Sequence, residues 1–208
     1  MHLIFLIGLS LSGLSMGHSA CSQDQHEFIT PSASDSRSPC PGLNALANQG
    51  YIPRDGRNIS LSQLADAMIE VMNLQIEAFS SKIQVTLEHS TTGNNSTFNL
   101  EDSNVHNVIE IDGSLSRNDL YFGETIYFNQ TIWDQTASKF HGDIITLHTA
   151  AESRAYRVAL DAATNPEFTP NEFISGLAPA IYMLVFGGIN ATHVRRDWVE
   201  SFFRELTL

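Results

Sequence analysis

Cys40 is the residue of this 208-residue chain whose type and setting most strongly suggest chemistry. It lies between two prolines in the segment SPCPGLNALAN and directly precedes a helical pattern. A sulfur at the start of a helix meets unpaired backbone N–H groups and the positive end of the helix dipole, and both favour the thiolate. Such a thiolate could be a nucleophile, which would need a histidine base, or a ligand to a metal. The sequence assigns no specific base to it.

The second cysteine, Cys21, is a possible disulfide partner for Cys40. The residues between them are rich in Ser, Pro, Asp and Gln and predict a flexible segment, so a disulfide here would constrain little of the fold. Cys40 is therefore a buried thiol, a partner of Cys21 or a ligand. One thiolate is sufficient as an axial ligand of haem iron, which makes a haem site plausible.

Histidine spacing and net charge argue against several other kinds of site. The eight histidines form no H-x-x-x-H pair and no Cys/His cluster of the kind that holds zinc. The formal net charge of -12 argues against binding nucleic acid or an anionic membrane surface through bulk electrostatics. We expect no nucleic-acid partner and no membrane partner, and no feature of the sequence predicts an oligomeric state.

The N-terminal segment 1–20, MHLIFLIGLSLSGLSMGHSA, has the pattern of a secretory signal peptide. Its apolar run is shorter than a membrane-spanning helix, and small residues follow it. Five N-x-[ST] sequons support secretion with surface glycans. We therefore expect a secreted, extracellular glycoprotein. The acceptor asparagines are Asn58, Asn94, Asn95, Asn129 and Asn190.

Helices are the elements that the sequence predicts around Cys40. Residues 61–79 show the one-sided apolar spacing of an amphipathic helix, which Ser60 or Ser62 would cap. The tetrapeptide Thr149-Ala-Ala-Glu152 is a candidate capping box ahead of another helix.

A second candidate capping box, Thr169-Pro-Asn-Glu172, precedes a helix that is apolar on all sides and therefore predicted to be buried. Pro179 would kink this helix, and residues 193–206 predict a final one. We find no convincing alternating strand pattern and no internal repeat. The sequence predicts an all-α protein with a flexible N-terminal arm at 21–36 and a single domain at 37–208.

Two sequence blocks carry a family resemblance. The segment SPCPGLNALANQGYIPRDGRNIS, residues 38–60, resembles the proximal motif of the fungal haem-thiolate peroxidases, the chloroperoxidase and unspecific peroxygenase family, and is most similar to its short members. HNVIEIDGSLSRNDLYFG, residues 106–123, is similar to the family's distal block, Glu-His-Asp followed by x-Ser-Leu-Ser-Arg. Weaker matches extend the resemblance over residues 37–205. It implies a single-domain, chloroperoxidase-like helical fold around a haem.

The resemblance also implies roles for individual residues. Cys40 would be the axial ligand of the iron of haem b. Glu110 and Ser114, with the backbone carbonyl of Ile111, would bind Mg²⁺ beside a haem propionate, a ligand set that suits a hard cation. Read without the resemblance, Glu110 and Asp112 would belong to a solvated turn. Asp112 occupies the position that orients the family's distal histidine, and it is our candidate catalytic residue.

The sequence departs from the family at the distal acid–base pair. Ile111 replaces the histidine, and alignment from the ATNPEF segment puts Ile181 at the position of the glutamate. Positions 173–196 contain no Asp or Glu at all. Such groups typically contribute about 10²–10⁴-fold to rate, so we expect weak activity. Glu152 could substitute for the missing acid–base residue, but the capping box explains it better. His148 is expected at the surface.

Three functions follow in order of preference. The first is a secreted haem-thiolate peroxidase or peroxygenase that uses hydrogen peroxide to oxidise or oxygenate small organic substrates. The second is a non-catalytic protein of the same fold that binds haem or a hydrophobic ligand. The third is a secreted interaction protein without haem, against which the intact PCP segment and the pair Glu110 and Ser114 argue. The family continues beyond the segment that corresponds to FFRELTL, so the C-terminus is expected to be shortened.

Overall fold

The computed structural model describes residues 26–170, 172–188 and 191–204. The signal peptide expected at 1–20, Cys21 with its possible disulfide, the acceptor Asn190 and the end of the chain at 205–208 lie outside the described residues.

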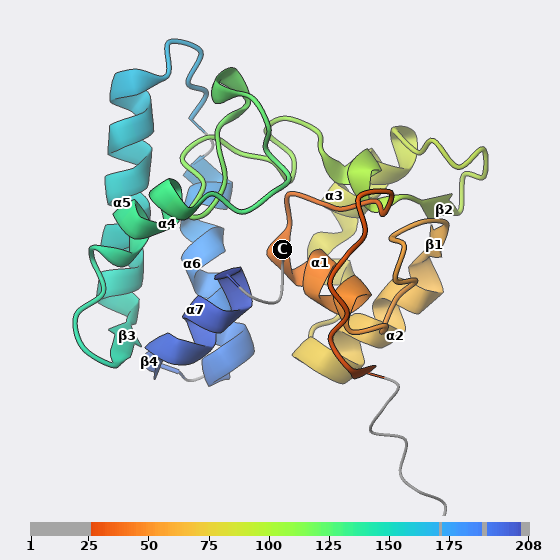
Figure 1. The fold of residues 1–208 in the computed structure, drawn as a ribbon, viewed down its shortest axis with the longest axis horizontal. Helices are drawn as coiled ribbons and strands as arrows, with labels where there is room; N and C mark the ends of the chain where they lie inside the picture. Colours follow the sequence, from red (N-terminus) through yellow and green to blue (C-terminus); the bar gives the residue numbers. More distant parts are fainter. Residues whose placement is uncertain (1–25, 171, 189–190, 205–208) are drawn as a thin grey trace, which may run out of the picture.

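The described residues form a predominantly helical fold, which confirms the expected all-α class. Figure 1 shows two halves, one built from α1, α2 and α3 and the other from α4 to α7. The helices are α1 (Pro41–Asn48), α2 (Leu61–Met72), α3 (Ser80–Glu88), α4 (Gln130–Ala137), α5 (Leu147–Thr164), α6 (Glu172–Gly187) and α7 (Arg196–Arg204), with 3-10 helices η2 (Ile76–Phe79), η3 (Leu100–Ser103) and η4 (Leu120–Phe122).

Short antiparallel strand pairs accompany the helices of each half. β1 (Ile59–Ser60) pairs with β2 (Thr97–Phe98), and β3 (Ile144–Thr146) pairs with β4 (His193–Arg195). In the second pair only the central residues, Ile145 and Val194, are buried. Strands of two or three residues are too short to produce a recognisable alternating pattern, which is why the sequence did not predict them.

The predicted helix at 61–79 is divided in the structure. Ser60 caps α2 as predicted, and its hydroxyl and the side chain of Gln63 form a reciprocal capping box. The helix ends at Met72 because Asn73 adopts the left-handed conformation, with φ 51°. A separate 3-10 helix, η2, then leads into α3. The prediction of one continuous helix over this segment was therefore wrong.

The predicted capping box at 149–152 was also wrong. α5 begins at Leu147, and the capping pair is Thr146 with Thr149, three residues earlier along the chain. Thr146 is also the last residue of β3, so the strand pairing places the start of the helix here. Glu152 instead contacts His148 on the surface, with 3.3 Å between His148 Nδ1 and a carboxylate oxygen of Glu152.

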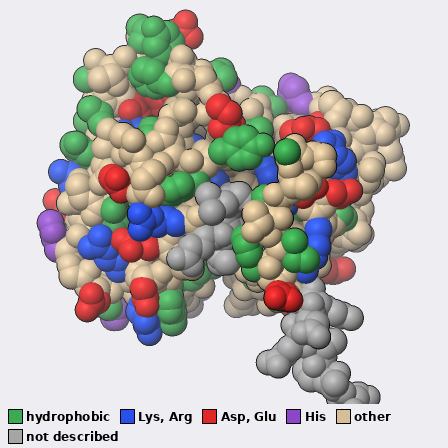
Figure 2. Space-filling view, in the orientation of Figure 1, with side chains coloured by type: hydrophobic (Ala, Val, Ile, Leu, Met, Phe, Trp, Pro, Cys, Tyr) green, Lys and Arg blue, Asp and Glu red, His purple; other side chains and the backbone are tan. Residues whose placement is uncertain are grey.

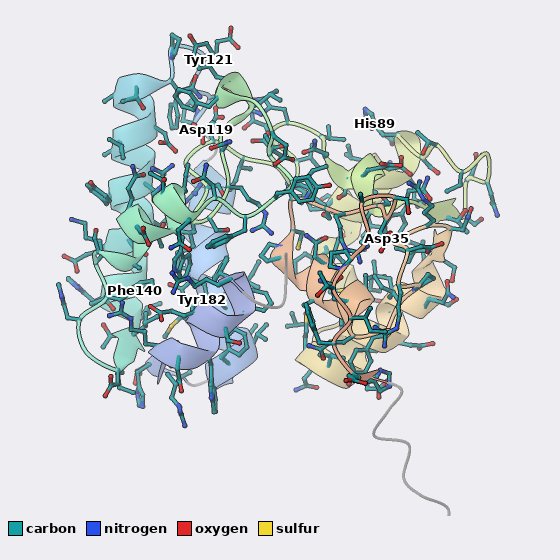
Figure 3. The ribbon with its side chains drawn as sticks, viewed as in Figure 1. Asp35, His89, Asp119, Tyr121, Phe140 and Tyr182 are labelled. Atoms are coloured by element: carbon teal, nitrogen blue, oxygen red, sulfur yellow. The ribbon has the colours of Figure 1, made fainter. Side chains whose placement is uncertain are left out.

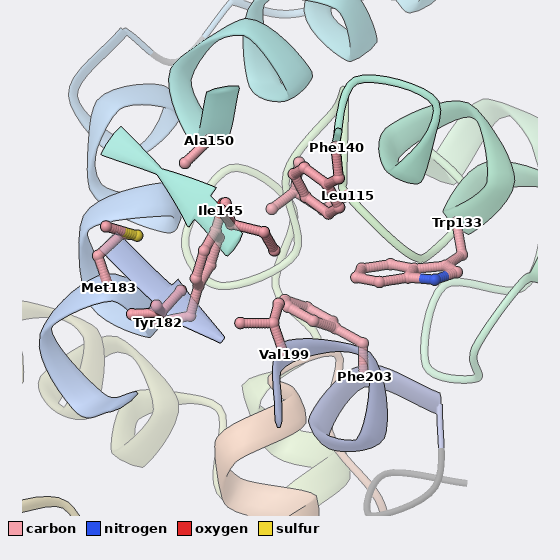
Figure 4. Close-up of a cluster of buried hydrophobic side chains, with 10 residues drawn as sticks. Leu115, Trp133, Phe140, Ile145, Ala150, Tyr182, Met183, Val199 and Phe203 are labelled. Carbon is pink, nitrogen blue, oxygen red and sulfur yellow. The ribbon is translucent and has the colours of Figure 1, made fainter. Parts of the chain in front are cut away.

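Each half has its own cluster of buried apolar side chains. The cluster of the second half gathers around Trp133, which stacks on Phe203 of α7 at a ring-centroid distance of 4.8 Å (Figure 4). The cluster of the first half includes Leu46 of α1, Leu64 of α2 and Leu100 of η3. α1 also contacts α7, so the two halves touch through these helices.

The described part of the expected arm contacts the first half. The backbone N–H of Ile29 donates to the carbonyl of Asn48 at 2.9 Å, and the ring of His26 stacks on Tyr51. Ser36 is buried, and its backbone N–H donates to Asp55. These contacts run along α1 and the turn that follows it.

The outer surface carries charges of both signs. Figure 2 shows acidic and basic side chains interspersed over the visible face, with no continuous basic patch on it. Among the described residues, no helix has both the length and the apolar character needed to cross a bilayer.

Candidate functional site

A cavity of about 250 Å³ lies between the two halves and is lined mainly by apolar side chains. The first half contributes Leu46, Leu64 and Ile83, and the second contributes Val185, Phe186 and Phe202. Because both halves supply its walls, the shape of the cavity depends on how the two halves pack against each other. An apolar cavity of this kind suits a hydrophobic ligand or cofactor.

Cys40 is at the wall of this cavity and is the N-cap residue of α1. Pro41 follows at the first helical position, where the missing N–H of proline costs nothing. The backbone N–H of Cys40 donates to Ser38 Oγ at 3.0 Å, and Ser38 is held by paired hydrogen bonds with the side chain of Asn44. No cysteine among the described residues pairs with Cys40, and the structure places this residue at a helix N-terminus, as predicted.

Gly42 keeps the space beside this sulfur open. A Cβ at Gly42 would lie 3.8 Å from Cys40 Sγ and 3.2 Å from Met72 Cε. The tight approach is the one to Met72, so the absence of a side chain at Gly42 mainly lets Met72 of α2 pack against the start of α1.

Arg117 adds a buried positive charge to the same wall. Its guanidinium donates to the carbonyl of Ile126 at 3.0 Å and to Ser116 Oγ at 2.7 Å. Burial lowers the pKa of Arg117 to about 10, while the nearby charges of Cys40 and Glu124 favour its protonated form. Arg117 is therefore cationic at neutral pH. The sequence analysis assigned it no role, although it is the arginine of the x-Ser-Leu-Ser-Arg pattern.

Ile111 and Ile181 line the same cavity, one from the distal block and one from α6. Ile111 is buried, and Ile181 is partly exposed. The neighbouring Tyr182 is buried on α6 and faces the aromatic cluster (Figures 3 and 4), and burial raises the pKa of its hydroxyl. The two residues that replace the expected acid–base pair therefore belong to one apolar surface.

Glu110 and Asp112 are buried, whereas a solvated turn would expose them. His106 Nδ1 lies 2.5 Å from Glu110 Oε2, and His106 Nε2 lies 3.9 Å from Asp112 Oδ2. Burial raises the pKa of both carboxyl groups. His106 was not predicted to belong to the site. The segment from His106 to Glu110 is not helical, so its four-residue spacing gave no signal, and a backbone bridge between the two residues brings their side chains together.

Ser114 lies at the cavity wall, but its hydroxyl oxygen faces its own turn. This oxygen accepts hydrogen bonds from the backbone N–H groups of Ser116 and Arg117 at 3.4 and 3.3 Å. Ile111 and Ser114 line the cavity, and Glu110 is not among its lining residues. The three expected Mg²⁺ ligands are thus neighbours in the chain, and the Glu110 carboxylate is directed to His106.

Gly113 and Asp119 hold the turn that carries these residues. Gly113 has φ 72°, and its backbone N–H donates to Asp119 Oδ1 at 2.8 Å. Asn165 donates to the other carboxylate oxygen of Asp119 at 3.1 Å, which ties the turn to the end of α5. Arg154 of α5 donates to the carbonyl of Gly113. Figure 3 shows Asp119 in the loop that precedes α4.

The candidate substitutes for a distal base lie away from the cavity. His148 and Glu152 have side chains that are 80% and 52% exposed. His148 is thus at the surface, as expected, and neither residue lines the cavity.

The acceptor asparagines differ in how accessible they are. Asn58, Asn94 and Asn95 are exposed. Asn129 is half-buried, and its side-chain oxygen caps α4 by accepting from the N–H groups of Thr131 and Ile132. Its amide nitrogen donates to Asn118. Glycosylation at Asn129 would compete with a structural role.

Comparisons with known proteins identify the family of the chain. The family model described as peroxidase, family 2, matches residues 26–208. An aromatic peroxygenase from Coprinellus radians is 32% identical over 174 residues, which cover 73% of this chain and 66% of the relative. An aromatic peroxygenase from Cyclocybe aegerita is 32% identical over 161 residues, covering 67% and 43% of the two chains. A chloroperoxidase from Leptoxyphium fumago is 41% identical over 97 residues, covering 44% and 26%.

The chain thus spans 66% of the first relative and less than half of the other two. The match of the family model nevertheless includes the helix start at Cys40, the distal block and α4 to α7. This chain belongs to peroxidase family 2, the fungal haem-thiolate peroxidases.

Proposed function

We propose that this chain is a secreted haem-thiolate peroxidase or peroxygenase that acts on small apolar organic molecules. The observation that carries the proposal is the position of Cys40 at a helix N-terminus, in the wall of an apolar cavity that both halves line. The residues present fit haem b. The apolar walls suit the macrocycle, Cys40 would supply a thiolate ligand to the iron, and Arg117 would supply positive charge for an anionic group.

When bound, the haem would supply the oxidising chemistry with hydrogen peroxide. The chain's own residues would position the Cys40 sulfur, bind the substrate and exclude water from the cavity. The N-terminus of α1 carries the sulfur, and the cationic Arg117 lies in the same cavity wall. Apolar side chains such as Phe186 and Phe202 would orient an apolar substrate.

Ile111 and Ile181 would exclude water from the distal side and provide no group that can move a proton. Because acid–base groups typically contribute about 10²–10⁴-fold, turnover would be slow. Asp112 is the retained polar residue of the distal block, but its carboxylate faces His106 and the N–H of Thr169. We therefore propose that it positions the distal block.

Mg²⁺ at Glu110, the carbonyl of Ile111 and Ser114 is the cation site that the resemblance implies. One observation supports a cation here: Glu110 Oε1 is buried without a hydrogen-bond partner among the described residues. Carboxylate, carbonyl and hydroxyl oxygens suit Mg²⁺.

The optical spectrum of purified protein tests the haem proposal. The reduced protein with carbon monoxide should show the strongly red-shifted Soret band of thiolate ligation, and Cys40→Ala should lose it. Peroxide-dependent conversion of a small aromatic probe, above the rate of free haem, tests the enzymatic part. A protein that binds no haem when supplied with it would refute the proposal.

A non-catalytic haem or hydrophobic-ligand binding protein is the second candidate. The two isoleucines in the cavity wall favour it, because they leave the distal side without an ionisable side chain at the family's positions. This candidate predicts the thiolate-type spectrum and spectral shifts on addition of apolar ligands, without turnover.

A further inference from the structure

Three metal-ligating side chains come together within the distal block, those of His106, Glu110 and Asp112. Each offers one donor atom, and these atoms lie within 4.8 Å of one another. The cluster is partly closed from solvent: the His106 side chain is 31% exposed, and the carboxyl side chains are 4% and 1% exposed. The backbones of His106 and Glu110 also form a bridge, so the ring and the carboxylate are held by local structure.

Each carboxylate in the cluster has one oxygen that the protein leaves unpaired. Glu110 Oε1 and Asp112 Oδ1 are buried and have no hydrogen-bond partner among the described residues. Their second oxygens are occupied, Oε2 of Glu110 by His106 and Oδ2 of Asp112 by the N–H of Thr169 at 2.7 Å. An unsatisfied buried polar group costs about 1–3 kcal/mol, and a charged one costs more. Two such oxygens in one cluster point to a bound group.

The local charge balance indicates that the group is a cation. The charged groups that act on Glu110 are His106, Asp112 and Asp119, and the buried Arg154 guanidinium donates to the backbone carbonyl of Asp112. With Glu110 itself, the three carboxylates of this region outnumber the histidine and the arginine. Asp119 also acts on Asp112. A divalent ion would neutralise this excess and would satisfy the unpaired oxygens.

We propose that His106, Glu110 and Asp112 form a binding site for a divalent transition-metal ion such as Mn²⁺. The site rests on the cation of the proposed function, but it replaces an oxygen-only ligand set with one that includes nitrogen. Imidazole favours transition metals, whereas Mg²⁺ favours oxygen ligands alone. The Ser114 hydroxyl, which accepts from two backbone N–H groups, is not part of this set.

The contact between His106 and Glu110 would also orient the histidine ring. With one ring nitrogen bound to the ion, the other would donate to a carboxylate, as metal-bound histidines commonly do. The short contact between His106 Nδ1 and Glu110 Oε2 is suited to that role. Removal of such a partner typically weakens metal binding about 10–100-fold.

Mn²⁺ binding to the full-length protein tests the site through a spectroscopic signal that is independent of turnover. Protein stripped of divalent ions is reduced, saturated with carbon monoxide to make haem iron EPR-silent, and titrated with Mn²⁺. We expect one tightly bound Mn²⁺ per chain, displaced poorly by Mg²⁺, with ¹⁴N modulation of its electron spin echo from a coordinated imidazole.

His106→Gln should abolish the ¹⁴N modulation and weaken Mn²⁺ binding about ten-fold or more. His148→Gln is the matched control, because His148 forms a similar pair with a glutamate four residues later but is exposed. This control should change neither signal. If His106→Gln fails to fold, the echo modulation of the unmodified protein decides the question alone.

Two results would overturn the proposal. Mn²⁺ bound without ¹⁴N modulation, and weakened by Ser114→Ala, would show an oxygen-only site. No tight Mn²⁺ binding in protein with the thiolate-type haem spectrum would refute the metal site and leave the proposed function intact. Conversely, the expected Mn²⁺ signals in protein that binds no haem would support the site and refute the proposed function.

Discussion

Cys40 and the two cavity isoleucines show why individual residues were predictable to different degrees. The sulfur's position follows from local sequence, because a proline at the first helical position and a free cysteine before it determine the N-cap. That Ile111 and Ile181 share one cavity depends on how two distant segments pack, and only the family resemblance suggested it. His106 was missed because its role depends on two carboxylates being buried, which the residue types alone did not indicate.

At the two isoleucines, the double variant Ile111→His with Ile181→Glu should increase peroxide-dependent turnover of a small aromatic probe. The expected gain is about 10²-fold or more, because a general acid–base pair would be restored at the cavity wall. The measurement is the initial rate per haem, with each single variant as a control.

Neither single variant should reach the rate of the double variant, since the histidine and the glutamate act together. A double variant that binds haem with a thiolate-type spectrum and remains inert would contradict the view that these side chains limit activity.

At Gly113, substitution by alanine should destabilise the protein by about 3 kcal/mol. The residue has φ 72°, which costs a non-glycine residue roughly 1–2 kcal/mol, and a Cβ would lie 3.1 Å from the backbone Cα of Val158. Denaturant unfolding measures the change. Gly93→Ala is the matched control: with φ 77° and nothing within 4 Å of its Cβ, it should cost only the conformational part, about 1 kcal/mol.

At the scale of elements, the existence of helices was predictable, and their ends were less so. Ser60 and Ser62 were both predicted as possible caps, and Ser60 takes this role because its partner Gln63 is three residues away. The start of α5 was misplaced because two overlapping candidates, at Thr146 and Thr149, compete, and the pairing of β3 with β4 decides between them. The end of α2 was missed because Asn73 can be helical or left-handed, and sequence periodicity does not distinguish the two.

Asn129 is the N-cap of α4, so we expect it to have a structural role and not to carry a glycan. Asn129→Ala should lower the free energy of unfolding by about 1 kcal/mol, because it removes the oxygen that accepts from Thr131 and Ile132. Asn129→Asp keeps a capping oxygen and should be nearly neutral. Denaturant unfolding measures both.

Thr131→Ala removes the sequon and leaves the Asn129 side chain in place. We expect it to leave both the glycan mass and the stability nearly unchanged, whereas loss of a glycan in the mass spectrum of this variant would show that Asn129 is modified. Removal of the exposed Asn58 or Asn94 acceptors should lower the glycan mass.

At the scale of the whole molecule, the two halves meet around an apolar cavity, and a ligand there would join them. The walls come from α1, α2 and α3 on one side and from the distal block, α6 and α7 on the other. The chain length predicted a domain with a core and the apolar spacing predicted helices, but neither predicted two separate clusters with a cavity between them. That arrangement depends on long-range packing, for which the sequence carries no local signal.

Haem should therefore make the unfolding of the two halves a single event. Tryptophan fluorescence reports on Trp133 in the second half, circular dichroism reports on all helices, and the Soret band reports on the cavity. In haem-loaded protein the three transitions should coincide. At a free haem concentration 100-fold above its dissociation constant, binding would add about 2.7 kcal/mol to stability.

Cys40→Ala should separate the fluorescence and circular-dichroism transitions, because the axial bond to the first half is lost. Loss of the Soret band well before the other two signals in the unmodified protein would mean that the haem does not couple the halves.

The position of the Cys40 sulfur in the cavity wall also bears on whether the protein should take up haem before it meets an oxidant. In the peroxide-dependent function that we propose, the Cys40 sulfur in the cavity wall would be open to oxidation before haem binds, first to sulfenic acid and then irreversibly to sulfinic acid. Iron bound to the sulfur would block that reaction. Maturation must therefore precede exposure to oxidant, and protein that meets peroxide first should gain oxygen mass at Cys40 and permanently lose the ability to take up haem.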